Sequence, residues 1–314
     1  MQIVDKTKTE WDFYHYFQSA EYSQHFLKKC YEKKQITEAE TKSYDNCYPF
    51  LYYLEQGELY YQQAAQCPLS IKPIMLFYGF IQLIKAVILT EDPFYPETTS
   101  VLAHGVTARK RKKQNYRFLN DEVKIQKNGL FSHFSHKLFN IKQLTGEKFT
   151  MHELLLQIPE MEESFQILFQ KPTLIWFNHH QQLTVSEEVL QHFHMSKDLF
   201  KEYLNGLLGN TIEWINDDTL QVKEKKEVPP LRYHQKKEKL SLPYTRTTVG
   251  SYPEVLIHYA ILYNLSMIAR YETEWWMELL KNHSNEDYPL IYSFIEITTS
   301  KTPTFILNML KSRI

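Results

Sequence analysis

Residues 71–113, IKPIMLFYGFIQLIKAVILTEDPFYPETTSVLAHGVTARKRKK, decide the fold of this chain. In the first half of the stretch, apolar side chains occupy nearly every face of a helix, and such a helix has to be covered by other elements. Its polar residues Tyr78, Gln82 and Lys85 are four and three positions apart, so they share one face. The stretch ends in five consecutive cations that begin at Arg109. The spacing therefore predicts a buried central helix with a single polar stripe.

The composition favours a helical globular protein. The chain has 314 residues, of which 43% are apolar, so it can bury a sizeable core. It holds only 8 Gly, which favours helices over a turn-rich β-sandwich. The net charge of −1 gives no global field towards nucleic acid or membrane, so an electrostatic site has to be a local patch. The 3 Cys form no CxxC, which indicates neither a disulfide framework nor a zinc site and fits a cytoplasmic location.

The central apolar helix is long enough to cross a bilayer, but Gln82 and Lys85 interrupt it. A lysine at the centre of a membrane span is costly. The N-terminal residues also lack the basic-then-apolar pattern of a signal peptide. We therefore expect a helix buried in protein, and no membrane partner.

A second apolar run covers residues 255–269, after a capping-box pattern formed by Ser251 and Glu254. We expect this helix to continue to about Asn282. Its polar residues again fall on one face: Tyr259, Tyr263, Ser266 and Arg270. The two apolar helices are far apart in sequence and each must be buried, so we expect them to pack against each other.

The remaining patterns predict an α+β fold that is mostly α, in one compact domain over residues 1–314. The helical core comes from residues 1–104 and 250–314, and a mixed α/β section of about 105–249 is inserted between them. In that section, alternation of apolar and polar residues predicts strands at residues 123–125, 174–185 and 211–222. The charged residues 223–239 are interpreted as an exposed loop.

The polar stripes of the two apolar helices carry one cation each, Lys85 and Arg270. A buried cation must be paired or hydrogen-bonded. The two stripes could face a shared anionic ligand, or they could belong to an internal network with acids such as Glu274. We favour a ligand role for Lys85, whose helix offers no acid within a turn. A structural role is favoured for Arg270, because Glu274 is four residues away.

Two further segments carry cations suited to phosphate. His104 precedes the basic run that starts at Arg109, which could contact nucleic-acid phosphates or could be a solvated patch. Residues 243–254 place Arg246 before a helix start, where free N–H groups favour an anion; the alternative is an ordinary loop and cap. The predicted ligand or anion site is Lys85, His104, Arg109, Arg246 and Arg270.

Metal and cofactor signatures are absent from the sequence. The 13 His form no HExxH motif and no compact quartet with Cys, so no metal site is predicted. No Walker, GxGxxG or GxSxG motif occurs either, so we assign no cofactor and no catalytic residue.

The order of several motifs resembles the YaaC-like family of Bacillus-type bacteria. The motifs are YYLEQGELYYQQA from Tyr52, PIMLFYGFIQLIKA from Pro73, AHGVTARK from Ala103, NGLFSHF from Asn128, MHELLLQIPE from Met151 and LIHYAILYNLSMIARYETEWW from Leu256. The resemblance spans nearly the whole chain. It implies a cytosolic, largely helical protein and implies no particular activity.

A weaker likeness runs from Tyr78 to Val106. A helix with the pair Lys85-Ala86, a connector and then His104 resembles the core of HEPN domains, helical modules of RNA-targeting systems. HEPN ribonucleases carry an Arg, four to six residues and then a His, and no Arg of this sequence has a His at that spacing. The likeness therefore implies a binding role without ribonuclease activity.

These observations leave three hypotheses for function. The first is a non-catalytic module that binds a nucleotide or a nucleic acid through the five predicted site residues. The second is an enzyme acting on a phosphorylated small molecule, with His104 as acid or base. The third is a scaffold that docks a protein or a second copy of the chain as a homodimer.

Overall fold

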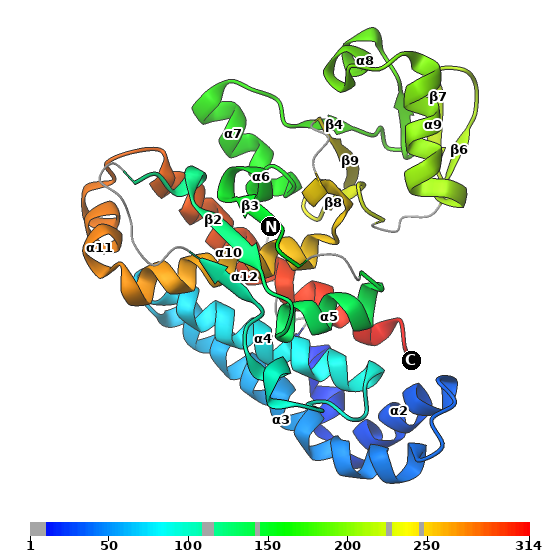
Figure 1. The fold of residues 1–314 in the computed structure, drawn as a ribbon, viewed down its shortest axis with the longest axis vertical. Helices are drawn as coiled ribbons and strands as arrows, with labels where there is room; N and C mark the ends of the chain where they lie inside the picture. The colour runs from blue at the N-terminus through cyan, green and yellow to red at the C-terminus, as the bar shows by residue number, and fades with distance from the viewer. Residues whose placement is uncertain (1–10, 109–115, 142–144, 224–227, 245–247) are drawn as a thin grey trace, which may run out of the picture.

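The computed structural model describes residues 11–108, 116–141, 145–223, 228–244 and 248–314. Figure 1 shows a helical body, with a smaller unit that contains α8, α9, β6 and β7 at the upper right. The described elements are mainly helices, with three small antiparallel sheets between them. The predicted α+β fold, mostly α, is therefore confirmed.

The N-terminal helices form one side of the body. Residues 11–14 are helical and lead into η1 (His15–Gln18), α2 (Ala20–Lys33), α3 (Ala39–Gln66) and α4 (Lys72–Glu91). Thr37 and Glu40 have the spacing of a capping box, but Glu38 occupies the N-cap position of α3 and makes no side-chain cap bond. Pro49 lies inside the continuous helix α3.

The C-terminal helices differ from the prediction at their ends. They are α10 (Glu254–Tyr271), α11 (Thr273–Asn282) and α12 (Asp287–Lys311). The helix expected to reach Asn282 is broken at Glu272. The last described helix, α12, is continuous and contains Pro303. The residue at the N-cap of α10 is Pro253, so Ser251 and Glu254 form no capping box.

The first part of the middle section packs onto the helical core. Its elements are η2 (Thr99–Leu102), β1 (Val106–Ala108), η3 (Phe118–Asn120), β2 (Glu122–Ile125), α5 (Leu130–Phe139), β3 (Lys148–Thr150), α6 (Met151–Leu155), η4 (Pro159–Met161) and α7 (Glu162–Phe169). The strands form the antiparallel sheet β1–β2–β3, in which Val123 pairs with Phe149. The strand predicted at residues 123–125 is confirmed, and its buried residues Val123 and Ile125 join the main hydrophobic core.

The second part has a hydrophobic core of its own, around Phe200 and Leu220. Its elements are β4 (Leu174–Trp176), β5 (Gln182–Thr184), α8 (Glu187–Phe193), α9 (Lys197–Leu208), η5 (Gly209–Thr211), β6 (Ile212–Trp214), β7 (Thr219–Val222), β8 (Arg232–His234) and β9 (Lys239–Pro243), with η6 (Thr248–Ser251) before α10. They form the antiparallel sheets β4–β9–β8 and β5–β7–β6.

The strands predicted at residues 174–185 and 211–222 are correct in part, because a turn divides each of them into two shorter strands. The Asn178 Oδ1 accepts hydrogen bonds from the backbone N–H groups of His180 and Gln182, which ends β4 before β5 begins. The Asn216 Oδ1 accepts hydrogen bonds from the backbone N–H groups of Asp218 and Thr219, which forms the turn between β6 and β7. Asparagine turns of this kind compete with a continuous strand. The loop predicted at 223–239 is also wrong in part, because the strand β8 lies within it.

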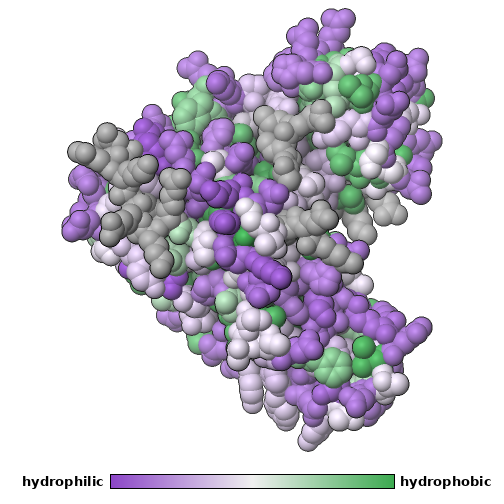
Figure 2. All heavy atoms as spheres, viewed as in Figure 1, coloured by the Kyte–Doolittle hydropathy of each residue, from purple (hydrophilic) through white to green (hydrophobic). Residues whose placement is uncertain are grey.

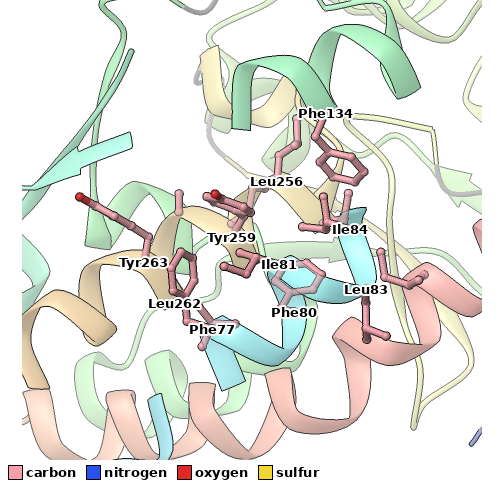
Figure 3. Close-up of a cluster of buried hydrophobic side chains, with 14 of the residues drawn as sticks. Phe77, Phe80, Ile81, Leu83, Ile84, Phe134, Leu256, Tyr259, Leu262 and Tyr263 are labelled. Atoms are coloured by element: carbon pink, nitrogen blue, oxygen red, sulfur yellow. The ribbon is translucent and has the colours of Figure 1, made fainter. Parts of the chain in front are cut away.

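The predicted packing of the two apolar helices is confirmed. The ring centroid of Phe77 on α4 lies 5.5 Å from that of Tyr259 and 5.7 Å from that of Tyr263, both on α10. Figure 3 shows these rings together with Phe80 and Leu262 in one buried cluster. In the described part of the chain, α4 is the one helix long and apolar enough to cross a membrane, and 72% of that window is buried inside the protein. The face of the molecule seen in Figure 2 is mostly hydrophilic, with small hydrophobic patches.

Candidate functional site

The polar stripe of α4 consists of the side chains of this helix that reach the surface between Leu76 and Thr90. From Leu76 to Thr90, every residue is buried except Tyr78, Gln82 and Lys85, which are half-buried. The helical spacing therefore predicted this face correctly. The stripe lies beside α10, so polar groups of both helices can meet there.

Lys85 is a half-buried cation without an acidic partner. Its Nζ lies 5.4 Å from the ring centroid of Tyr53 on α3, and no hydrogen bond or ion pair joins it to another described residue. Burial lowers the pKa of Lys85. One turn earlier, the buried Oε1 of Gln82 also has no hydrogen-bond partner in the described chain. Buried polar groups are normally satisfied, so these two side chains mark a place that a ligand could complete.

Arg270 is held by α10 and by the stripe of α4. Its Nε donates to the Ser266 carbonyl oxygen at 3.0 Å, and its Nη1 donates to the Tyr78 hydroxyl at 3.0 Å. The predicted pairing of Arg270 with Glu274 is wrong, because Glu274 is exposed and no ion pair of the described residues joins the two side chains. The reason is the break at Glu272, which places Glu274 on a separate helix.

The backbone of His104 is fixed by two segments that cross at glycines. The Leu130 N–H donates to the Ala103 carbonyl at 2.7 Å, and the His104 carbonyl accepts from the Phe131 N–H and the Tyr259 hydroxyl. At the crossing, Gly129 has a φ of 127°, and a Cβ added to it would lie 2.4 Å from the Cα of Gly105. Only glycine permits such an approach. The sequences AHGV and NGLF therefore meet in space.

The imidazole of His104 lies among aromatic rings of α4 and α10. Its centroid is 5.1 Å from that of Phe77 and 5.6 Å from that of Tyr263. Burial lowers the pKa of His104, and the positive charges of Arg270 and Lys85 lower it further. Three of the five predicted site residues thus share one electrostatic environment. Within the described chain, no hydrogen bond holds the ring nitrogens of His104.

Tyrosines form the walls of this site, and two of them come from α3. Tyr53 lies beneath Lys85, and Tyr60 stacks on Tyr78 with centroids 6.1 Å apart. Sequence reasoning missed both, although their spacing of seven residues placed them on one face of α3. We refer to the whole group as the cationic seam, which consists of Lys85, His104, Arg270, Gln82, Tyr53, Tyr60, Tyr78 and Tyr263.

The other two predicted site residues, Arg109 and Arg246, lie outside the described residues. Strand β1 follows His104 and ends at Ala108, the last described residue before Arg109. Among the described residues, no group of three or more His, Cys, Asp or Glu side chains is placed to hold a metal ion.

A second polar cluster is fully buried, and sequence reasoning missed it. The Lys301 Nζ lies 2.5 Å from a carboxylate oxygen of Glu160 and 2.5 Å from one of Glu254. His258 contacts Glu254 and Thr298. Burial alone would raise the pKa of Glu254, but the charge of Lys301 and the hydrogen bond to His258 outweigh it and lower this pKa to about 2. The two carboxylates share the ammonium of Lys301, and such direct contact of opposite charges is typical of a structural network.

One comparison with known proteins gives a match. A family model described as YaaC-like Protein matches residues 15–310. No curated protein and no solved structure matches the chain.

Proposed function

The chain belongs to the YaaC-like family, and from that premise we propose that it binds a nucleotide or a nucleic acid, without catalysis, at the cationic seam. The observation that carries this proposal is the half-buried ammonium of Lys85, which pairs with no carboxylate of the described residues. A cation that the fold leaves unmatched, with a second at Arg270, suits an anion supplied from outside.

The neighbouring groups favour a phosphate joined to a flat ring. Lysine and arginine are the usual phosphate binders, and arginine forms directed hydrogen bonds to phosphate oxygens. Nucleobases stack on tyrosine rings, which the seam offers at the half-buried Tyr53 and Tyr78. The unpartnered Oε1 of Gln82 can accept a hydrogen bond from a ring N–H or amino group.

The arrangement of His104 supports binding rather than catalysis. A catalytic imidazole is usually oriented by a carboxylate and bonded to a nucleophile. In the described structure, the ring of His104 is surrounded by Phe77, Tyr78 and Tyr263, and neither a carboxylate nor a nucleophile is bonded to it.

A thermal-shift series tests the proposal. Nucleotides or short oligonucleotides should raise the melting temperature of the wild-type protein, and nucleic-acid binding should weaken steeply with salt. Lys85→Met should abolish the shift. Lys281→Met, which removes an exposed cation of α11, is the matched control and should leave it intact. The proposal is wrong if no such ligand stabilises the wild type, or if Lys85→Met responds like the control.

One observation favours a second candidate, an enzyme acting on a phosphorylated small molecule. The lowered pKa of His104 keeps its imidazole neutral at neutral pH, as a general base requires. Turnover of a stabilising phosphorylated ligand, lost in His104→Gln while binding remains, would favour this candidate over binding alone. The likeness to HEPN domains and the cytoplasmic location stay predictions.

A further inference from the structure

A row of exposed tyrosines lies on another face of α3, away from the cationic seam. The side chains of Tyr44, Tyr48 and Tyr52 are 65%, 52% and 58% exposed and are spaced four residues apart. The rings of Tyr48 and Tyr52 lie 6.1 Å apart. Large exposed side chains that gather on one face indicate an interaction surface, unlike single scattered ones. Around the axis of α3, Tyr52 is rotated by about 100° from Tyr53, and Tyr44 and Tyr48 are rotated further. The exposed tyrosines therefore do not face the cationic seam.

Tyr48 and Tyr52 line a groove that lies between η1 and α3. Its volume is about 380 Å³, and its lining includes the buried rings of Tyr14 and Phe17 and the exposed rings of Tyr48 and Tyr52. A cavity of this size admits a long side chain or a short stretch of peptide. The groove therefore offers shape as well as exposed aromatic surface.

Two carboxylates, Glu55 and Glu58, line the same groove, and no cation of the described residues pairs with either of them. Glu55 makes no hydrogen bond or ion pair with a described residue, and the carboxylate of Glu58 only accepts a bond from Gln62 at 3.1 Å. From residue 46 to residue 66 the sequence of α3 contains no Lys or Arg. The groove is thus both aromatic and acidic, although the whole chain is nearly neutral.

We propose that this groove docks a basic segment of a partner protein. An Arg or Lys of that segment lies over the rings of Tyr48 and Tyr52 and pairs with Glu55 or Glu58. Cations bind the faces of aromatic rings, and a nearby carboxylate adds a charge-assisted hydrogen bond.

The same charges argue against a second copy of the chain at this place. In a two-fold symmetric contact, each copy would use the same surface. A contact centred on the groove would bring Glu55 and Glu58 of both copies together, and these like charges would repel. It would also place two concave surfaces opposite each other, which cannot pack closely. A basic partner has neither problem.

Fluorescence anisotropy with a labelled peptide tests this inference. The probe is a short peptide in which Arg alternates with Gly, and its matched control has Gln at each Arg position. The Arg peptide should bind and the Gln peptide should not. The double variants Tyr48→Ala/Tyr52→Ala and Glu55→Gln/Glu58→Gln should each weaken binding roughly tenfold. Tyr292→Ala and Glu278→Gln, exposed positions on α12 and α11, should bind like the wild type.

Circular dichroism checks that each variant is folded, and the isosteric Glu→Gln changes keep the test valid if the tyrosine changes disturb α3. The inference is overturned if the Arg peptide does not bind, or if the groove variants bind it as well as the control variants do. It is also overturned if light scattering shows a dimer of the wild type that Tyr48→Ala/Tyr52→Ala converts to a monomer.

Discussion

Replacing Lys85 by Met tests whether its ammonium serves the fold or a ligand. No described carboxylate pairs with it, so its removal leaves no buried charge unmatched. The desolvation cost that lowers its pKa would also disappear. We therefore expect the free energy of unfolding, measured in urea, to stay unchanged or to rise. A large loss of stability without ligand would show that Lys85 is structural.

The pH dependence of binding should report on His104. In the free protein, burial and the charges of Arg270 and Lys85 lower its pKa below the ordinary value of 6.5. A bound phosphate favours the imidazolium and raises this pKa, so binding takes up a proton. Affinity should therefore increase as the pH falls from about 8 to about 6.

An oligonucleotide is the suitable ligand for this measurement, because its phosphodiesters do not titrate in that range. In His104→Gln the affinity should no longer change with pH over this window, while some binding through Lys85 and Arg270 remains. If the wild type and His104→Gln show the same pH profile, His104 does not take part in binding.

Residue spacing predicted some members of the cationic seam and not others. Tyr78, Gln82 and Lys85 were found because helical periodicity alone puts them on one face. Tyr53 could not be assigned to the site, because its approach to Lys85 depends on how α3 packs on α4. Packing between helices is a tertiary property that no local pattern encodes.

At the scale of elements, the glycine crossing between the His104 segment and α5 should tolerate no side chain. Gly129→Ala would place a Cβ against the backbone of Gly105, at a φ that other residues rarely adopt. We expect a loss of roughly 2 to 5 kcal/mol in the free energy of unfolding. Ligand-induced stabilisation should also fall, because His104 is held by the same crossing.

Gly206→Ala is the matched control for this prediction. Gly206 lies in α9, and a Cβ added there meets nothing within 4 Å. Alanine in a helix should stabilise the protein by about 0.5 to 1 kcal/mol. Equal stability of Gly129→Ala and wild type in urea unfolding would mean that the two segments do not cross as closely as described.

Element ends were the least predictable features. The apolar periodicity gave α4 and the body of α10 correctly, because burial of a helix face requires it. The capping box predicted at Ser251 failed because α10 begins only at Glu254, whose carboxylate pairs with Lys301. The split of the predicted strands depended on Asn178 and Asn216, whose side chains form turns within apolar alternation.

At the scale of the molecule, two hydrophobic cores are joined by a polar contact. The main core includes the long helices and the sheet β1–β2–β3, and the smaller core lies within residues 175–242. The buried network around Lys301 spans the boundary: α10 and α12 supply Glu254 and Lys301, and the Tyr233 carbonyl of β8 accepts from the ammonium at 3.2 Å. Its charges therefore hold the sheet β4–β9–β8 against the helices.

Lys301→Met should consequently behave in the opposite way to Lys85→Met. It leaves the carboxylates of Glu160 and Glu254 buried without their ammonium, which should cost roughly 3 to 5 kcal/mol of unfolding free energy. Hydrogen exchange should accelerate first in β8 and β9, because their contact with the helices is lost. Adding Glu254→Gln should restore part of the lost unfolding free energy, because it removes one of the two buried charges that have no ammonium partner. If Lys301→Met is as stable as Lys85→Met, the network does not hold the two cores together.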